Sequence, residues 1–138
     1  MKRKFYFAYG ANMCVDSMSY RCPEAVPVTG YILRDWQLKF YSHATIEPQP
    51  GGRVAGILWS ITSDCEHHLD MFEGFPHYYT KLEWKQDSRE FFFYEMTGHK
   101  TGSPSDSYVE SIERAYKRWD LPADMLYHAL EHEQSHTN

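Results

Sequence analysis

At least six short segments rich in apolar and aromatic residues, separated by turn-forming residues, constrain the fold of this 138-residue chain most strongly. In one of them Trp36, Leu38 and Phe40 alternate with Gln37 and Lys39, which is the period of a strand with one buried face. Turn residues at 34–35, 48–52 and 86–89 separate neighbouring segments. The sequence therefore predicts strands over residues 4–9, 28–33, 36–41, 44–47, 54–61, 78–85 and 90–96.

Helical patterns lie between and after these strands. A short helix is predicted over residues 13–20, and an amphipathic one begins at a capping box over residues 63–66. Leu69 and Phe72 are expected on the apolar face of that second helix, and Gly74 ends it. A second capping box over residues 107–110 opens a third helix, and the chain restarts as a helix near Pro122.

Length and charge limit the function classes. At 16.3 kDa the chain suits a single domain over residues 1–138. The formal charge of −5 argues against non-specific binding to nucleic acid or to an anionic membrane, which needs a basic surface. The first apolar run is broken by Gly10 and Asn12, too soon for a signal peptide or a membrane span. A cytoplasmic protein is expected.

The three cysteines, Cys14, Cys22 and Cys65, contain no CxxC pair, so reduced thiols are expected. Cys14 lies near a glycine-containing turn and is a candidate nucleophile, although an unpaired cysteine is more often a small buried hydrophobic residue.

Histidines at i, i+4 spacing follow in the last helix at positions 128, 132 and 136. That spacing can place imidazoles side by side for a metal, but no cysteine or carboxylate pattern completes a zinc site. A polar helix end in solvent explains the same run, and no cofactor is expected.

Glu73 is the candidate acid. It ends the second helix, where the negative end of the helix dipole disfavours a carboxylate and raises its pKa. Such conflicts with local rules are commoner at functional sites, while the alternative is a solvated glutamate paired with a nearby base.

Residues 10–13 connect the first buried strand to a helix. Unpaired backbone N–H groups at such a junction can hold an anion or a polarised carbonyl. An ordinary strand-to-helix connection explains the same pattern, so both interpretations stay open.

Several ordered motifs resemble the γ-glutamylcyclotransferase-like family. Residues 7–13 read FAYGANM, residues 44–46 read ATI, residues 54–59 read VAGILW and residues 69–74 read LDMFEG, in the order found in the family. Tyr79, Tyr94 and the S-P-x-x-x-Y stretch that ends at Tyr108 are similar to later family positions. The resemblance extends over nearly the whole chain.

The resemblance implies an α+β fold, a small closed mixed β-barrel with flanking α-helices. It also implies a cofactor-independent cyclotransferase of glutathione metabolism, a lyase or acyltransferase that converts the γ-glutamyl group of a γ-glutamyl amide to 5-oxoproline and releases an amine or amino acid. Glu73 is the implied catalytic residue. The implied substrate-binding residues are Tyr9, Gly10, Ala11, Asn12, Tyr79, Tyr94 and Tyr108.

Ala11 stands where the family usually has serine, so that hydroxyl is absent here. A non-catalytic binder of a small γ-glutamyl ligand on the same fold is the main alternative, and hydrolysis by a metal on the histidines near the C-terminus is a third. The leaving group and the oligomeric state do not follow from the sequence.

Overall fold

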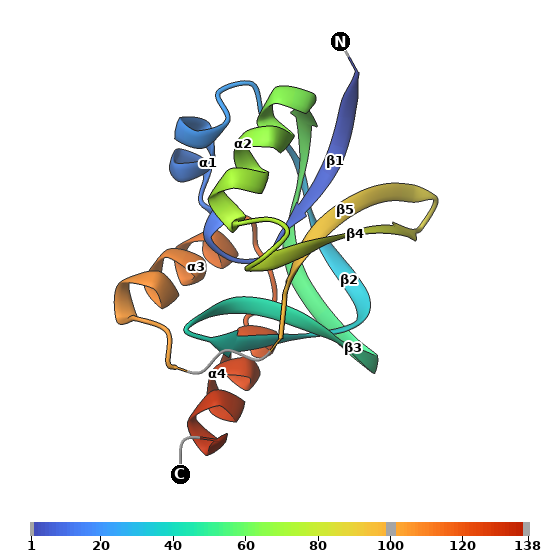
Figure 1. Cartoon of the computed structure of the whole chain (residues 1–138). Helices are drawn as coiled ribbons and strands as arrows, with labels where there is room; N and C mark the ends of the chain where they lie inside the picture. The colour runs from blue at the N-terminus through green and yellow to red at the C-terminus, as the bar shows by residue number, and fades with distance from the viewer. Residues whose placement is uncertain (1, 99–101, 137–138) are drawn as a thin grey trace.

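The computed structural model describes residues 2–98 and 102–136, with side chains to residue 131. It is an α+β fold in which one mixed sheet is flanked by helices, as predicted (Figure 1). The strands are β1 (Arg3–Ala8), β2 (Val26–Tyr41), β3 (His43–Thr62), β4 (Tyr79–Gln86) and β5 (Arg89–Met96). The helices are the 3₁₀ turn η1 (Ala11–Met13), α1 (Val15–Arg21), α2 (Ser63–Glu73), α3 (Asp106–Arg118) and α4 (Asp124–His136).

The sheet has the strand order β2-β3-β1-β5-β4, with β1 antiparallel to β3 and parallel to β5. A closed barrel is therefore wrong, because β2 and β4 are edge strands that share no ladder in the described chain. Side chains bridge these edges: Gln86 Nε2 donates to the Ile32 carbonyl and Gln86 Oε1 accepts from the Arg34 N–H, each at 2.9 Å. The Tyr31 hydroxyl of β2 also donates to the Gln86 carbonyl at 3.3 Å. The sheet is open, and side chains link its edges.

Two predicted strand pairs are single long strands. Residues 28–33 and 36–41 both belong to β2, which passes a register shift at Asp35, where φ is 71°. Residues 48–52, predicted as a turn, continue β3, and Pro48 lies opposite Trp36. The chain reverses instead at Ser42. The turn-forming residues at these positions do not end the strands, because the segments on both sides of them remain paired within the β2–β3 hairpin.

The N-caps of α2 and α3 lie earlier in the sequence than the predicted capping boxes. Thr62, rather than Ser63, caps α2, and its hydroxyl accepts from the Cys65 N–H at 3.2 Å. Ser105 caps α3 by accepting from the Tyr108 N–H at 3.2 Å. The end of α2 is as predicted, because Gly74 adopts the left-handed conformation with φ of 67°.

The core includes Phe7, Leu58, Trp59 and Phe93. The ring of Phe93 on β5 lies 5.0 Å from that of Trp36 on β2, so part of the core is enclosed by the curled sheet itself. On α2, Leu69 is buried as predicted. Phe72 is 47% exposed, so its assignment to the buried face is wrong.

Cys22, just after α1, and Cys65, in the first turn of α2, form a disulfide with Cα atoms 5.2 Å apart. The expectation of reduced thiols is wrong for this pair. The two cysteines are 43 positions apart in sequence, and only the packing of α1 beside α2 brings them together (Figure 1). Cys14 is free and partly buried.

Candidate active site

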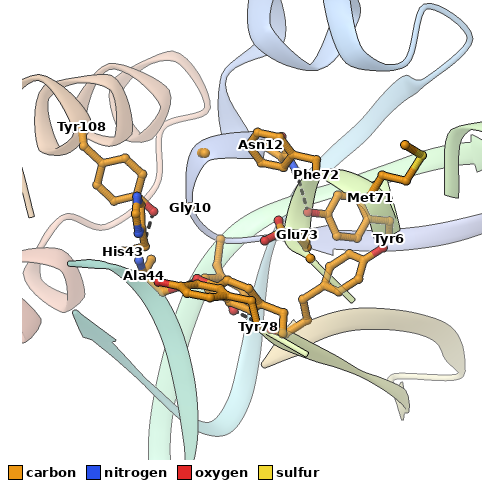
Figure 2. A pocket seen from close by; sticks show the side chains of 15 residues that line it. Tyr6, Gly10, Asn12, His43, Ala44, Met71, Phe72, Glu73, Tyr78 and Tyr108 are labelled. Atoms are coloured by element: carbon orange, nitrogen blue, oxygen red, sulfur yellow. Dashed lines mark hydrogen bonds between the residues drawn. The ribbon is translucent and has the colours of Figure 1, made fainter. Parts of the chain in front are cut away.

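A cavity of about 480 Å³ lies between the β1–η1 loop, the start of β3, the end of α2, the β4–β5 hairpin and α3. Figure 2 shows the Glu73 carboxylate in this space, with Tyr6 and Met71 on one side and His43 and Tyr108 on the other. The cavity brings together every residue implied as a site residue by the sequence, namely Tyr9, Gly10, Ala11, Asn12, Glu73, Tyr79, Tyr94 and Tyr108.

Glu73 is the last residue of α2, and the left-handed Gly74 turns the chain away immediately after it. Burial raises the pKa of the Glu73 carboxyl to about 7, while the charge of Arg21 opposes the shift. Within residues 2–98 and 102–131 the carboxylate has no hydrogen-bond donor or ion-pair partner. A group with this pKa can both accept and return a proton near neutral pH.

Asn12 lies in the 3₁₀ turn η1, lines the cavity and is almost completely buried. Its Oδ1 accepts from Arg21 Nη1 at 2.8 Å and its Nδ2 donates to the Tyr6 hydroxyl at 3.1 Å. The indole N–H of Trp59 donates to the Asn12 carbonyl at 3.1 Å. The Asn12 amide, expected from the sequence to hold substrate, is thus engaged at both ends by the protein itself.

Arg21 also lies against the end of α2. Its guanidinium carbon is 3.7 Å from the centre of the Phe72 ring, which makes a cation–π contact. The last turn of α2 has no basic residue of its own, so this cation from α1 complements the negative end of the helix dipole. Arg21 therefore links the loop at Asn12 to the helix that carries Glu73.

Hydrogen-bonded tyrosines form the other walls. The Tyr9 hydroxyl donates to the Tyr94 carbonyl, and the Tyr79 hydroxyl donates to the Ala44 carbonyl at 2.7 Å. The Tyr108 hydroxyl accepts from the Ala44 N–H at 3.0 Å. Burial raises the pKa of each of these tyrosines, that of Tyr108 to about 12, so all remain neutral at ordinary pH.

Gly10 lies where a side chain would not fit freely. A Cβ atom there would come within 3.1 Å of the Tyr108 hydroxyl and 3.2 Å of the Ala44 Cβ. The absence of a side chain at this position keeps the loop close to α3 and β3.

Sequence reasoning missed several residues that line the cavity. These are Tyr6, His43, Ala44, Met71, Gly74 and Tyr78, and Phe72 was expected in the core. For Tyr6 a signal was available, since it places a hydroxyl among the apolar residues Phe5, Phe7 and Ala8 of the first strand. The others come from segments whose approach depends on the β2–β3 hairpin and the turn after α2.

The described residues contain no group of three or more His, Cys, Asp and Glu side chains that could hold a metal. Of the three candidate histidines near the C-terminus, His132 and His136 have side chains outside the described residues. Cys14, the candidate nucleophile, does not line the cavity. No helix among the described residues is long and apolar enough to cross a membrane.

Comparison with known proteins identifies relatives of this site and fold. The family model described as gamma-glutamyl cyclotransferase, AIG2-like, matches residues 6–120. Gamma-glutamylcyclotransferase of Mus musculus is 30% identical, and that of Homo sapiens is 29% identical. Each match covers 86% of this chain and 73% of the relative.

A solved structure of a gamma-glutamyl cyclotransferase superposes with a TM-score of 0.80 at 26% identity, covering 97% of this chain and 86% of that one. A yeast cyclotransferase described as specific to glutathione has a TM-score of 0.58, covering 98% of this chain and 97% of that one, and at 11% identity it supports the fold alone. The expected family and its α+β fold are confirmed by the family model and by these relatives. The chain belongs to the gamma-glutamyl cyclotransferase, AIG2-like family.

Proposed function

We propose that this chain is a γ-glutamyl cyclotransferase that forms 5-oxoproline from a γ-glutamyl amide, with Glu73 as the residue that moves the proton. Family membership supports the reaction class. The single observation that carries the role of Glu73 is its carboxylate, unpaired within the described chain, in a cavity that raises its pKa to about 7.

The reaction begins at the α-amino group of the substrate. The α-amine nitrogen attacks the γ-carbonyl carbon to form a five-membered ring, and the Glu73 carboxylate accepts the proton that this nitrogen loses as the new C–N bond forms. Negative charge develops on the carbonyl oxygen as the new C–N bond forms. Glu73 then returns the proton to the leaving nitrogen, the original C–N bond breaks, and 5-oxoproline and an amine or amino acid are released. Ring closure within one molecule supplies the proximity that a second substrate would otherwise need.

The loop of residues 9–12 is proposed to hold the γ-glutamyl half of the substrate. Gly10 lies close to Tyr108 and Ala44, which leaves the loop backbone at the cavity wall. Three tyrosines form the rest of this wall. The hydroxyl groups of Tyr79 and Tyr108 bond to the Ala44 backbone, and that of Tyr94 bonds to the Asp70 carboxylate.

The leaving group is proposed to lie against an apolar rim. Three residues that line the cavity at the end of α2 and just after it are exposed, Met71 by 70%, Phe72 by 47% and Tyr78 by 37%. Exposed apolar residues beside a cavity are typical of ligand-binding surfaces. Apolar leaving groups should therefore be accepted more readily than charged ones.

The remaining assignments are part of the same proposal: one domain, no cofactor, no nucleic-acid or membrane partner, and action in the cytoplasm. The acidic net charge supports the choice of partners. The Cys22–Cys65 disulfide is unusual for a protein of a reducing compartment. Alkylation of free thiols in intact cells tests the location, because both cysteines should be reduced in the cytoplasm.

The test of function is release of 5-oxoproline from a panel of γ-glutamyl amides. The panel contains glutathione, γ-glutamyl amino acids with small, apolar and acidic side chains, and γ-glutamyl amines. Turnover of at least one member, slowed by roughly 10²–10⁴-fold in Glu73→Gln, is the expected result. Binding of panel members without turnover by the wild type would support the ligand-binding alternative instead.

A further inference from the structure

A chain of three side chains runs from α1 into the cavity. Arg21 donates to Asn12 Oδ1 at 2.8 Å, and Asn12 Nδ2 donates to the Tyr6 hydroxyl at 3.1 Å. Asn12 and Tyr6 are buried, and Tyr6 lines the cavity that contains Glu73 (Figure 2). The proposed mechanism does not use Tyr6.

The direction of every bond in this chain is fixed by chemistry. A guanidinium has donors only, so the atom of Asn12 that faces Arg21 must be the oxygen. The amide nitrogen therefore faces Tyr6 and donates to it. The Tyr6 oxygen accepts that bond and keeps its own proton for another acceptor.

No described residue accepts that proton. The ring of Tyr6 is held by stacking on Phe92, with centroids 5.3 Å apart, and by an edge contact with Tyr94 at 5.8 Å. Burial and the nearby charge of Glu73 raise the pKa of Tyr6 well above its ordinary value, so the hydroxyl stays protonated. A rigid, neutral donor thus faces the cavity, and its acceptor arrives with the substrate.

We propose that Tyr6 is a catalytic residue whose hydroxyl donates a hydrogen bond to the γ-carbonyl oxygen as charge develops there, and that Arg21 and Asn12 are positioning residues that set the direction of this bond. The inference rests on the proposed function. Asn12, which the resemblance implies as a substrate-binding residue, acts through Tyr6 in this proposal, because its amide N–H donates to the Tyr6 hydroxyl. No proton leaves Tyr6 in this step.

The first test is Tyr6→Phe, which removes the hydroxyl and keeps the stacked ring. We expect kcat for 5-oxoproline release to fall by about 10²-fold, as for loss of one oxyanion donor, with KM changed by less than about threefold. Tyr127→Phe is the matched control, because its hydroxyl donates to Glu113 at the surface at 2.9 Å and does not line the cavity. Thermal unfolding of both variants shows whether the fold is kept.

The second test, Asn12→Asp, separates bond direction from packing. Aspartate has the same shape and keeps the partner of Arg21, but it has no N–H, so the Tyr6 hydroxyl turns to donate to it. We expect a loss in kcat similar to that of Tyr6→Phe, and little further loss when both changes are combined. A purely structural Asn12 would tolerate this change, since a carboxylate pairs with Arg21 more strongly than an amide does.

The outcomes are distinct. Wild-type turnover by a folded Tyr6→Phe overturns the role of Tyr6 and leaves the cyclotransferase proposal intact. If Tyr6→Phe does not fold, Asn12→Asp alone decides, and wild-type kcat in it overturns the inference. Absence of 5-oxoproline from every panel member with the wild type overturns the proposed function and this inference together.

Discussion

The acidic residues at the two ends of helix α2 have opposite surroundings. Near its start Glu66 contacts Lys81 at 2.7 Å and Lys4 at 3.1 Å, and Asp70, one turn further on, contacts Lys81 at 2.9 Å. At its end, Glu73 has no such partner among the described residues and lines the cavity. Burial acts to raise the pKa of Glu66 too, but its bonds to Lys81 and Lys4 outweigh burial and lower it, whereas the pKa of Glu73 rises to about 7.

The charged partner, and not the residue type, therefore decides whether the pKa of a carboxylate on α2 is lowered or raised. The paired acids join α2 to β4 and β1 through their contacts with Lys81 and Lys4. Asp70 also accepts from the Tyr94 hydroxyl at 2.6 Å, so the paired region supports one wall of the cavity. The unpaired acid destabilises the fold when ionised, and its free oxygen atoms are what a proton-transfer role requires.

Glu73→Gln tests the proton-transfer role of the unpaired acid and should have the largest effect on turnover. We expect 5-oxoproline formation to slow by roughly 10²–10⁴-fold, because glutamine keeps the shape but cannot accept a proton. Binding of a γ-glutamyl ligand, measured by calorimetry, should persist. Glu110→Gln, an exposed change on α3, should leave turnover at the wild-type level, and equal rates in the two variants would remove Glu73 from the mechanism.

Lys81→Met removes the partner from the paired region. The free energy of unfolding should fall by about 2–3 kcal/mol, because Asp70 loses its cation and Glu66 keeps only Lys4. Denaturant titration measures the loss, with Lys85→Met on the exposed side of β4 as the control. No change in stability would mean that solvent already screens this cluster.

The pH dependence of stability should differ between Glu73 and Glu66, because folding raises the pKa of Glu73 and lowers that of Glu66. The folded-state pKa of Glu73 is raised from 4.5 to about 7, so its contribution to stability is full below pH 4.5 and is lost as pH rises through 7. Glu73→Gln should therefore gain on the wild type by about 1–2 kcal/mol between pH 5 and 8 in denaturant titrations.

Glu66→Gln should show the reverse trend. The pKa of Glu66 is lowered from 4.5, so its stabilisation is present above that pH and is lost as pH falls. Parallel pH profiles for the two variants would contradict the assignment of one acid as unpaired and the other as paired.

The smallest expected effect is that of Tyr94→Phe, which breaks the bond between the paired region and the cavity wall. Stability should fall by about 1 kcal/mol, since Asp70 keeps Lys81 as a partner. Tyr127→Phe, which loses a solvent-exposed hydroxyl bond to Glu113, should cost less. A loss for Tyr94→Phe as large as that for Lys81→Met would show that Asp70 depends mainly on the tyrosine.

Local periodicity and turn chemistry were enough to predict the β4–β5 hairpin and the position of Glu73 next to a left-handed glycine. The α+β class was implied by the resemblance of the ordered motifs to the family. The sequence also named eight residues that the structure brings into one cavity. It assigned the raised pKa of Glu73 to the helix dipole, whereas burial is the larger cause in the structure.

The remaining features of the fold and of the site depend on tertiary packing, since each of them joins residues that are far apart in the chain. The open sheet depends on which edges pair, and the Cys22–Cys65 disulfide on α1 packing beside α2. Whether an acid on α2 is paired depends on where β4 places Lys81. The direction of the bond at Tyr6 likewise required Arg21 to reach Asn12, a contact that no periodicity in the sequence encodes.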